Sequence, residues 1–134
     1  MRNTKRKPKP RVARTRNGGT WTQAMLMSRI RSALRRIWMY YKPRVAAKKM
    51  AERTVTGKRH KYEYKCESCK KWWKSKEVEV NHRIPAGSLK SFEDLPGFCD
   101  RLFCEDPKGY AVMCKSCHKI ETAKQREERK NGRS

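Results

Sequence analysis

The sequence contains few acidic residues, no long apolar run and no segment typical of an export signal. Its 134 residues include 13 Asp and Glu against 36 Lys and Arg, which gives a formal net charge of +23. No stretch approaches the ~18 consecutive apolar residues of a membrane-spanning helix. The charged amino terminus is not followed by the apolar segment of a signal peptide. We therefore expect a cytoplasmic protein that is neither secreted nor inserted in a membrane.

The positive charge is concentrated in the first half of the chain. Residues 1–65 contain 21 Lys and Arg against two acidic residues, whereas residues 66–134 contain 15 against 11. Such a field attracts a polyanion and gives salt-sensitive affinity through counterion release. The expected partner is therefore a polyanion, and the affinity that charge gives does not depend on its sequence. Residues 1–20 have no acidic and almost no apolar side chain, which predicts a disordered basic tail. A tail that merely aids solubility is the alternative.

An Arg-rich helical segment is expected over residues 21–53. Thr20 and Gln23 have the spacing of a capping box at its start, and Pro43 should end the first helix near Tyr41 or Lys42. A shorter helix over residues 45–50 is expected next. Apolar residues recur at three- and four-residue steps, as on the buried face of a helix: Met25, Ile30, Leu34, Ile37, Trp38 and Tyr41. The arginines between them are candidate phosphate contacts: Arg29, Arg31, Arg35 and Arg36.

Residues 54–129 have the pattern of a small α+β domain, followed by a flexible carboxyl terminus at 130–134. Residues 76–80 alternate charged and apolar side chains, which predicts a half-buried strand, and residues 110–113 form a second short apolar run. Residues 116–129 have a helix-forming composition. The segment between the strands, 88–106, is expected to be a loop with a short helix at 98–103. So small a body often needs a metal or disulfides to hold its fold.

The cysteines predict a structural metal site. Two CxxC pairs are separated by 44 residues, Cys66 with Cys69 and Cys114 with Cys117. Cysteines in a chain without an export signal should be thiols, which favours metal binding over disulfides. Two such knuckles can complete a tetrahedral four-sulfur zinc site. A redox pair would need a thioredoxin-like context that is absent. Cys99 and Cys104 lack this spacing and are expected to be core residues.

Three histidines occur in different settings. His60 lies in a basic run, where a solvated or phosphate-facing side chain is expected. His82 directly follows the predicted strand and Asn81, a position at which a side chain is fixed but accessible. His118 directly follows Cys117, so a zinc ion bound there would hold it rigidly beside the cluster. Taken alone, either of these two histidines is more typical of a structural role than of catalysis.

In this order around the cysteine pairs, the motifs resemble those of the HNH endonuclease family. The resemblance is carried by the CxxC pair at 66–69, VNHRIP at 80–85 and VMCKSCH at 112–118. IRSALRRIWMYYKPRVAA at 30–47, PAG at 85–87 and RLF at 101–103 make the chain similar to small HNH proteins of bacteriophages. The resemblance extends over roughly residues 28–126, and the combined motif is highly specific.

This resemblance implies a ββα-metal fold, in which a two-stranded hairpin and a helix clasp one catalytic divalent ion such as Mg, Mn or Ni. It implies that His82 is the general base that activates water and that Asn81 and His118 bind the catalytic metal. The zinc at the paired cysteines is then structural. Arg83 and Arg101 are candidate phosphate contacts, for which ordinary surface roles are equally consistent.

Three positions differ from the pattern that is frequent in the family. Asn81 stands where Asp is common, Gly109 lies near the position of the middle Asn, and Glu121 occupies the position of a frequent Lys. A neutral amide oxygen binds a hard dication more weakly than a carboxylate does. These departures affect the expected metal affinity and rate more than the expected fold.

The sequence thus predicts a metal-dependent DNA endonuclease that hydrolyses phosphodiester bonds, acts as a monomer and works beside phage packaging or replication proteins. One alternative is a zinc-knuckle DNA-binding module with weak or lost cleavage, which Asn81 favours. Another is an RNA-directed role, because charge alone does not separate RNA from DNA. No RNA-module signature or base-stacking sheet is evident in the sequence.

Overall fold

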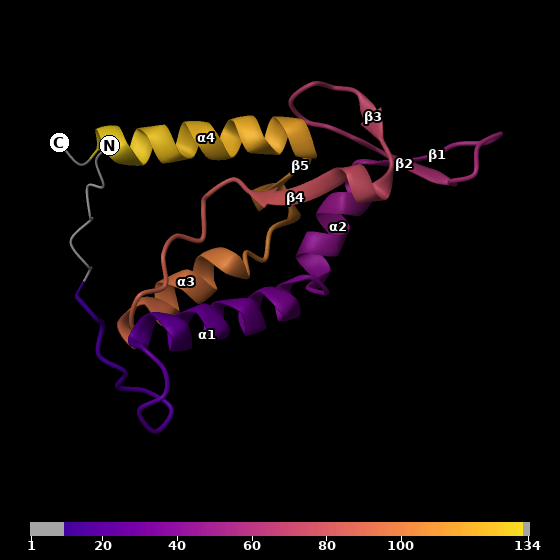
Figure 1. The fold of residues 1–134 in the computed structure, drawn as a ribbon. Helices are drawn as coiled ribbons and strands as arrows, with labels where there is room; N and C mark the ends of the chain where they lie inside the picture. Colours follow the sequence, from indigo (N-terminus) through magenta and orange to yellow (C-terminus); the bar gives the residue numbers. More distant parts are fainter. Residues whose placement is uncertain (1–9, 133–134) are drawn as a thin grey trace, which may run out of the picture.

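A computed structural model describes residues 10–132 and contains four α-helices and two small antiparallel sheets (Figure 1). The helices are α1 (Gln23–Trp38), α2 (Lys42–Met50), α3 (Leu95–Leu102) and α4 (Lys115–Asn131). The strands are β1 (Glu52–Thr54), β2 (Tyr62–Lys65), β3 (Trp72–Trp73), β4 (Val78–His82) and β5 (Tyr110–Cys114). Single 3₁₀ turns occur at Ser75–Glu77, Phe92–Asp94 and Pro107–Gly109. The chain therefore has the mixed helix-and-strand character that the sequence predicts.

The two sheets have different roles in the fold. Strands β1, β2 and β3 form one sheet in sequence order, and its β1–β2 hairpin projects from the body (Figure 1). Strands β4 and β5 pair from Val78 opposite Cys114 to His82 opposite Tyr110. Helix α4 follows β5 without an intervening residue and packs against both strands of this pair. The β4–β5 pair and α4 thus bring the ends of the long 83–109 connection together.

The amino-terminal part differs from the expectation of a disordered tail and a capping box at Thr20. Residues 1–9 of that tail lie outside the described residues. From Arg16 onward the chain is held in a turn, because Arg16 and Trp21 form a β-bridge and the Thr20 hydroxyl donates to the Asn17 carbonyl, 2.8 Å away. Thr22 is the N-cap of α1, and its hydroxyl accepts from the backbone N–H of Met25 at 3.2 Å.

Other predicted boundaries hold within a few residues. Helix α1 ends at Trp38, earlier than the predicted end near Tyr41. Pro43 lies in the first turn of α2, where its missing N–H costs nothing, so it begins the next helix instead of directly ending the first. The first predicted strand is shifted to Val78–His82, since Ser75–Glu77 forms a 3₁₀ turn. The second strand, the short helix before it and the last helix are confirmed. Helix α4 extends to Asn131, into the segment expected to be flexible.

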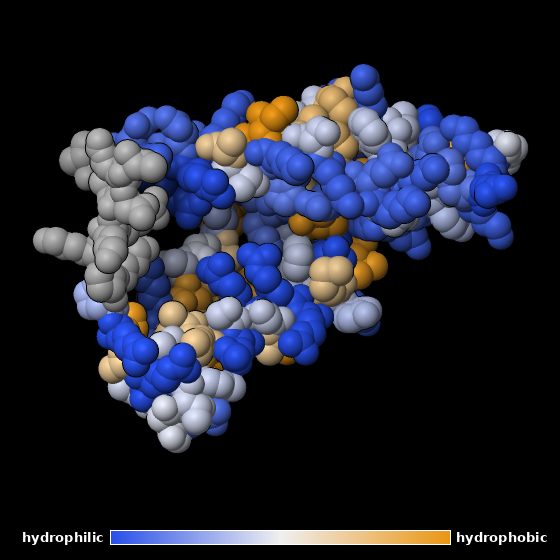
Figure 2. All heavy atoms as spheres, in the orientation of Figure 1, coloured by the Kyte–Doolittle hydropathy of each residue, from blue (hydrophilic) through white to orange (hydrophobic). Residues whose placement is uncertain are grey.

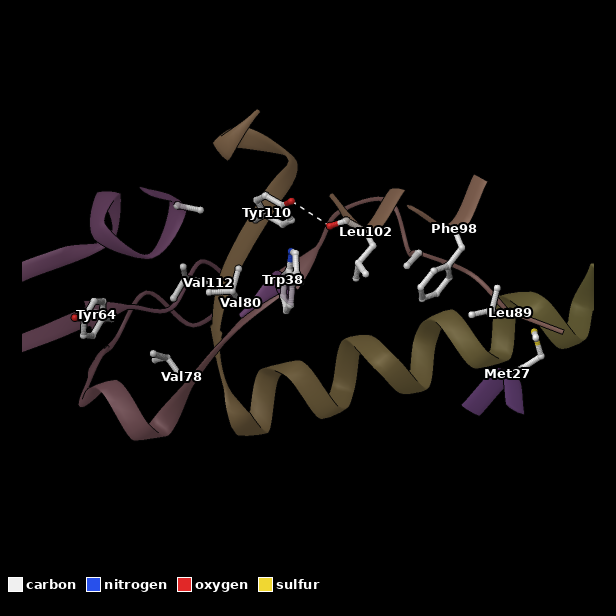
Figure 3. Packing of buried hydrophobic residues seen from close by; sticks show 12 residues of the cluster. Met27, Trp38, Tyr64, Val78, Val80, Leu89, Phe98, Leu102, Tyr110 and Val112 are labelled. Carbon is white, nitrogen blue, oxygen red and sulfur yellow. Dashed lines mark hydrogen bonds between the residues drawn. The ribbon is translucent and has the colours of Figure 1, made fainter. Parts of the chain in front are cut away.

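The core lies where α1, α3 and the β4–β5 pair meet. Phe98 and Leu102 of α3 are completely buried, and Trp38 at the end of α1 packs against the strands. Figure 3 shows Trp38 beside Val80 and Val112, with the Tyr110 hydroxyl directed at the Leu102 carbonyl. This packing fixes α1 against β4. In the described range, none of the helices has the length and apolar character needed to cross a membrane.

Candidate metal centre and catalytic cleft

The first feature of the site is a cluster of the four paired cysteines. The Sγ atoms of Cys66, Cys69, Cys114 and Cys117 all lie within 4.8 Å of one another. Around the first pair, the backbone N–H of Cys66 donates to the Lys71 carbonyl and that of Lys70 to the Cys66 carbonyl, both at 2.9 Å. Lys70 has a φ of 64°, which closes the turn tightly. The cluster has the donor set and spacing of a structural metal site such as zinc.

The second pair of the cluster is positioned by regular structure. Cys114 is the last residue of β5 and the N-cap of α4, while Cys117 lies in the first turn of that helix. The first knuckle is joined to the same strand, because the backbone N–H of Glu67 donates to the Val112 carbonyl at 2.8 Å. A cation bound here would therefore clamp the end of β2, the end of β5 and the start of α4 to one point.

Two thiols of this cluster, those of Cys66 and Cys117, have strongly shifted pKa values. Burial opposes ionisation of Cys66, but backbone N–H groups of Cys69, Cys114 and Ser68 outweigh it and lower the pKa of Cys66 to about 6. The hydrogen bond between Cys114 and Cys117, followed by burial, raises the pKa of Cys117 to about 12. Cys66 is thus the more easily ionised of these two thiols, and a bound cation would have to displace the Cys117 proton.

The two remaining cysteines are outside this cluster. Cys99 and Cys104 are half-buried free thiols, and Cys104 packs against the core. A Cβ atom at Gly109 would lie 2.5 Å from the Cys104 sulfur. A side chain at position 109, near the place where the middle Asn of the HNH pattern is expected, would therefore require the Cys104 sulfur to move.

The second feature of the site is a cleft of about 620 Å³ between α1 and α4, floored by the end of β4. Figure 2 shows it as the hollow between α4 above and α1 below. Its lining includes the three residues that the sequence singled out for chemistry: Asn81, His82 and His118. They come from the end of β4 and the first turn of α4, which the β4–β5 pair and the cysteine cluster hold together.

His82 is more enclosed than its position after a strand suggested. Only 8% of the residue is exposed, because the Trp38 ring stacks on the imidazole with the centroids 4.5 Å apart and Tyr110 contacts its edge. The Nε2 atom lies 2.9 Å from the Leu102 carbonyl oxygen. Because a carbonyl oxygen only accepts, Nε2 carries the proton and Nδ1 is the acceptor of the neutral ring.

The electrostatic surroundings keep His82 neutral. Burial is the main cause that lowers the pKa of His82, and the positive charges of Arg35 and Arg44 lower it further. The hydrogen bond to the Leu102 carbonyl acts in the opposite direction but does not reverse the shift. A neutral imidazole with a free acceptor nitrogen is the form that can take a proton from water.

Asn81 and His118 lie at the cleft in partly exposed positions. Asn81 pairs with Ala111 across the sheet. Along β4 the partly exposed residues Glu79 and Asn81 alternate with the buried residues Val78, Val80 and His82. The Nδ1 atom of His118 is hydrogen-bonded to a carboxylate oxygen of Glu79. The amide oxygen of Asn81 and the second ring nitrogen of His118 are suitable donors for a divalent cation.

Two of the six predicted phosphate contacts line the cleft. Arg31 and Arg35 extend from α1, and the Arg31 guanidinium donates to the Gly87 carbonyl at 2.7 Å. Partial burial and then repulsion from Arg31 lower the pKa of Arg35 from its ordinary value. Two neighbouring guanidinium groups opposite the histidines form a site suited to a phosphate.

The other four arginines have different surroundings. Arg83 forms a two-point ion pair with Glu67 and donates to the Lys108 carbonyl at 2.7 Å, so its guanidinium holds the first knuckle to the 83–109 connection. Arg101 donates to the Ala86 carbonyl at 2.7 Å. Arg29 lies over the ring of Trp21, whereas Arg36 is exposed on α1. Their contacts with DNA stay predictions.

A buried carboxylate in the β1–β2 hairpin was missed by sequence reasoning. Glu63 is 5% exposed and accepts from Arg53 at 2.7 Å and Lys58 at 3.1 Å, while His60 Nε2 lies 2.9 Å from it. His60 is thus paired within the hairpin instead of solvated. These contacts, with Arg53 first, lower the pKa of Glu63 to about 2.

Known proteins add no assignment to this geometry, because no family model, curated protein or solved structure gives a significant match to the chain.

Proposed function

We propose that this protein is a metal-dependent endonuclease of the HNH type that hydrolyses phosphodiester bonds in DNA. The observation that carries the proposal is the shared cleft, which brings Asn81, His82 and His118 together with Arg31 and Arg35. The antiparallel β4–β5 pair followed at once by α4 is consistent with a ββα-metal core. In this proposal the four-cysteine cluster holds a structural zinc.

The proposed reaction begins with water activation by His82. The Nδ1 atom accepts a proton from the attacking water, while the bond from Nε2 to the Leu102 carbonyl holds the ring in the required tautomer. Arg31 and Arg35 bind and orient the scissile phosphate. A divalent ion such as Mg, Mn or Ni, held by Asn81 and His118, would neutralise the charge that develops on the phosphate and on the leaving oxygen.

The donor chemistry suits such an ion. An amide oxygen and an imidazole nitrogen are both ligands of first-row and hard dications, and a carboxylate lies next to His118. The strong positive charge of the chain supports a polyanionic substrate and predicts cleavage that weakens with added salt. Encoding by a phage, and work beside packaging or replication proteins, belong to the same proposal.

The decisive experiment compares plasmid cleavage by wild type, His82→Ala and His60→Ala with Mn, Mg or Ni added. His60 is the matched control because it is paired with Glu63 in the hairpin and does not line the cleft. We expect nicking or linearisation by wild type and by His60→Ala, and a loss of at least ~100-fold for His82→Ala, the usual contribution of a general base. Wild-type protein that binds the plasmid but never cuts it with any of these metals would refute the proposed endonuclease activity.

A DNA-binding module without cleavage is the second candidate, and two observations favour it. Asn81 offers the metal no charge, and His82 is only 8% exposed, with Trp38 stacked on its ring. The same assay separates the two functions, since a module retards plasmid migration with every metal and cuts it with none. Competition with RNA in that assay tests whether DNA is the preferred polyanion.

A further inference from the structure

Glu79 lies beside the two proposed metal ligands, Asn81 and His118, but has no role in the proposed reaction. It precedes Asn81 by two residues on β4, and residues two apart share a face of a strand. The flanking residues Val78 and Val80 are buried, whereas Glu79 and Asn81 are partly exposed. Helix α4 crosses this face, and its His118 Nδ1 atom is hydrogen-bonded to the Glu79 carboxylate.

This contact determines which nitrogen of His118 is free. A carboxylate only accepts hydrogen bonds, so the Nδ1 atom of His118 must carry a proton, and the lone pair of the neutral ring is then on Nε2. Histidines that bind metals commonly donate their second ring N–H to a carboxylate, which fixes the ring and increases its basicity. The pair of Glu79 and His118 has this arrangement before any ion is bound.

The charges around His118 make the carboxylate important for binding a cation. The cleft is lined by Arg31, Arg35 and Arg129, and the other side of α4 near Glu79 by Lys115, Lys119 and Arg126. Among the groups that line either surface, Glu79 and Glu128 are the carboxylates. Asn81 and a neutral His118 contribute no negative charge, so the Glu79 carboxylate, in contact with His118, reduces the repulsion that a dication would meet from these cationic side chains.

We propose that Glu79 is a positioning residue for the catalytic metal: it holds His118 in the Nδ1-protonated tautomer, so that Nε2 binds a divalent ion, and its charge compensates for the neutral Asn81. This inference rests on the proposed function, because it assumes that His118 is a metal ligand. It identifies Glu79 as the source of the negative charge that an Asp at position 81 would otherwise supply.

The first test is made on the wild-type protein and needs no variant. Long-range ¹H–¹⁵N correlation spectra of zinc-loaded protein at pH 8 report the tautomer of each of the three histidines. We expect His118 to have its proton on Nδ1 and a bare Nε2. A His118 ring that carries its proton on Nε2 would overturn the proposal.

The second test measures Mn²⁺ binding by the loss of the free-ion electron paramagnetic resonance signal, again on zinc-loaded protein. Mn²⁺ is a hard ion that prefers oxygen and nitrogen donors, so it does not compete for the four sulfurs. We expect Glu79→Gln to weaken Mn²⁺ binding about 10- to 100-fold, the usual effect of losing such a partner. Glu77→Gln, which removes the same charge two residues earlier, is the control and should bind as wild type does.

Two further outcomes separate the inference from the proposed function. If His118→Ala abolishes Mn²⁺ binding but Glu79→Gln binds with unchanged affinity, the positioning role is wrong and the metal site stands. If wild type binds no Mn²⁺, or binds it equally well without His118, both the positioning role and the proposed metal-dependent function fail. Zinc content and thermal melting of each variant verify that the fold is intact.

Discussion

Replacing Cys114 by Ser removes one sulfur from the four-cysteine cluster and should unfold the protein. The cluster joins the turn at 66–71 to the junction of β5 and α4, across 44 intervening residues. In the chain-entropy relation, closing a loop of about 45 residues contributes about 4 kcal/mol. Structural zinc sites in small peptides contribute about 10–16 kcal/mol in total.

The zinc contribution is comparable to the whole stability of a typical small domain, about 5–15 kcal/mol, and the loop-closure contribution alone is a large fraction of it. The core described above is modest, with α3, one end of α1 and the β4–β5 pair as its main contributors. Loss of the ion should therefore leave little or no folded protein at room temperature. A strong chelator should have the same effect on the wild type, and added zinc should reverse it.

The assay combines zinc content with thermal melting followed by circular dichroism. Cys99→Ser is the matched control, because Cys99 is a half-buried thiol outside the cluster. We expect one zinc per chain and a cooperative transition for wild type and Cys99→Ser, and neither for Cys114→Ser. A zinc-free Cys114→Ser protein that melts like wild type would refute the structural role of the cluster.

Two further predictions concern single side chains. Glu63→Gln should flatten the acid sensitivity of stability, because the lowered pKa of Glu63 contributes stability that is complete above about 4.5 and is lost as the pH falls toward about 2; melting temperatures between pH 5 and 2 check this against Glu127→Gln, an exposed carboxylate on α4. Trp38→Ala should destabilise the fold by about 3–5 kcal/mol and raise the pKa of His82, because the burial that lowers it is lost; a His82 pKa that stays unchanged in an NMR titration would contradict that cause.

Local patterns were sufficient to predict the elements that hold the site. The alternation at 76–80 and the apolar run at 110–113 predict β4 and β5, and the charged composition after Ser116 predicts α4. The CxxC spacing predicts a four-sulfur cluster, and the structure brings the four sulfurs together. These features depend on residues that are close in sequence or on a donor pattern that is specific to one kind of site.

Features that depend on tertiary packing were not predictable. The sheet of β1, β2 and β3 is made of strands two to four residues long in a basic region, and Glu63 is buried there only because Arg53, Lys58 and His60 surround it. The stacking of Trp38 on His82 requires α1 to cross the end of β4. The contact between Glu79 and His118 likewise depends on where α4 crosses the strand.

The long 83–109 connection, which separates β4 from β5 and α4, has a consequence for the order in which the fold forms during synthesis. Because a chain grows from its amino terminus, the nascent polypeptide leaves the ribosome with β4 lacking its partner strand until β5 emerges. The cleft draws on residues from Arg31 to Arg129, so a nascent chain lacks it until α4 has emerged. Whatever chemistry the cleft performs therefore begins only after α4 has been synthesised.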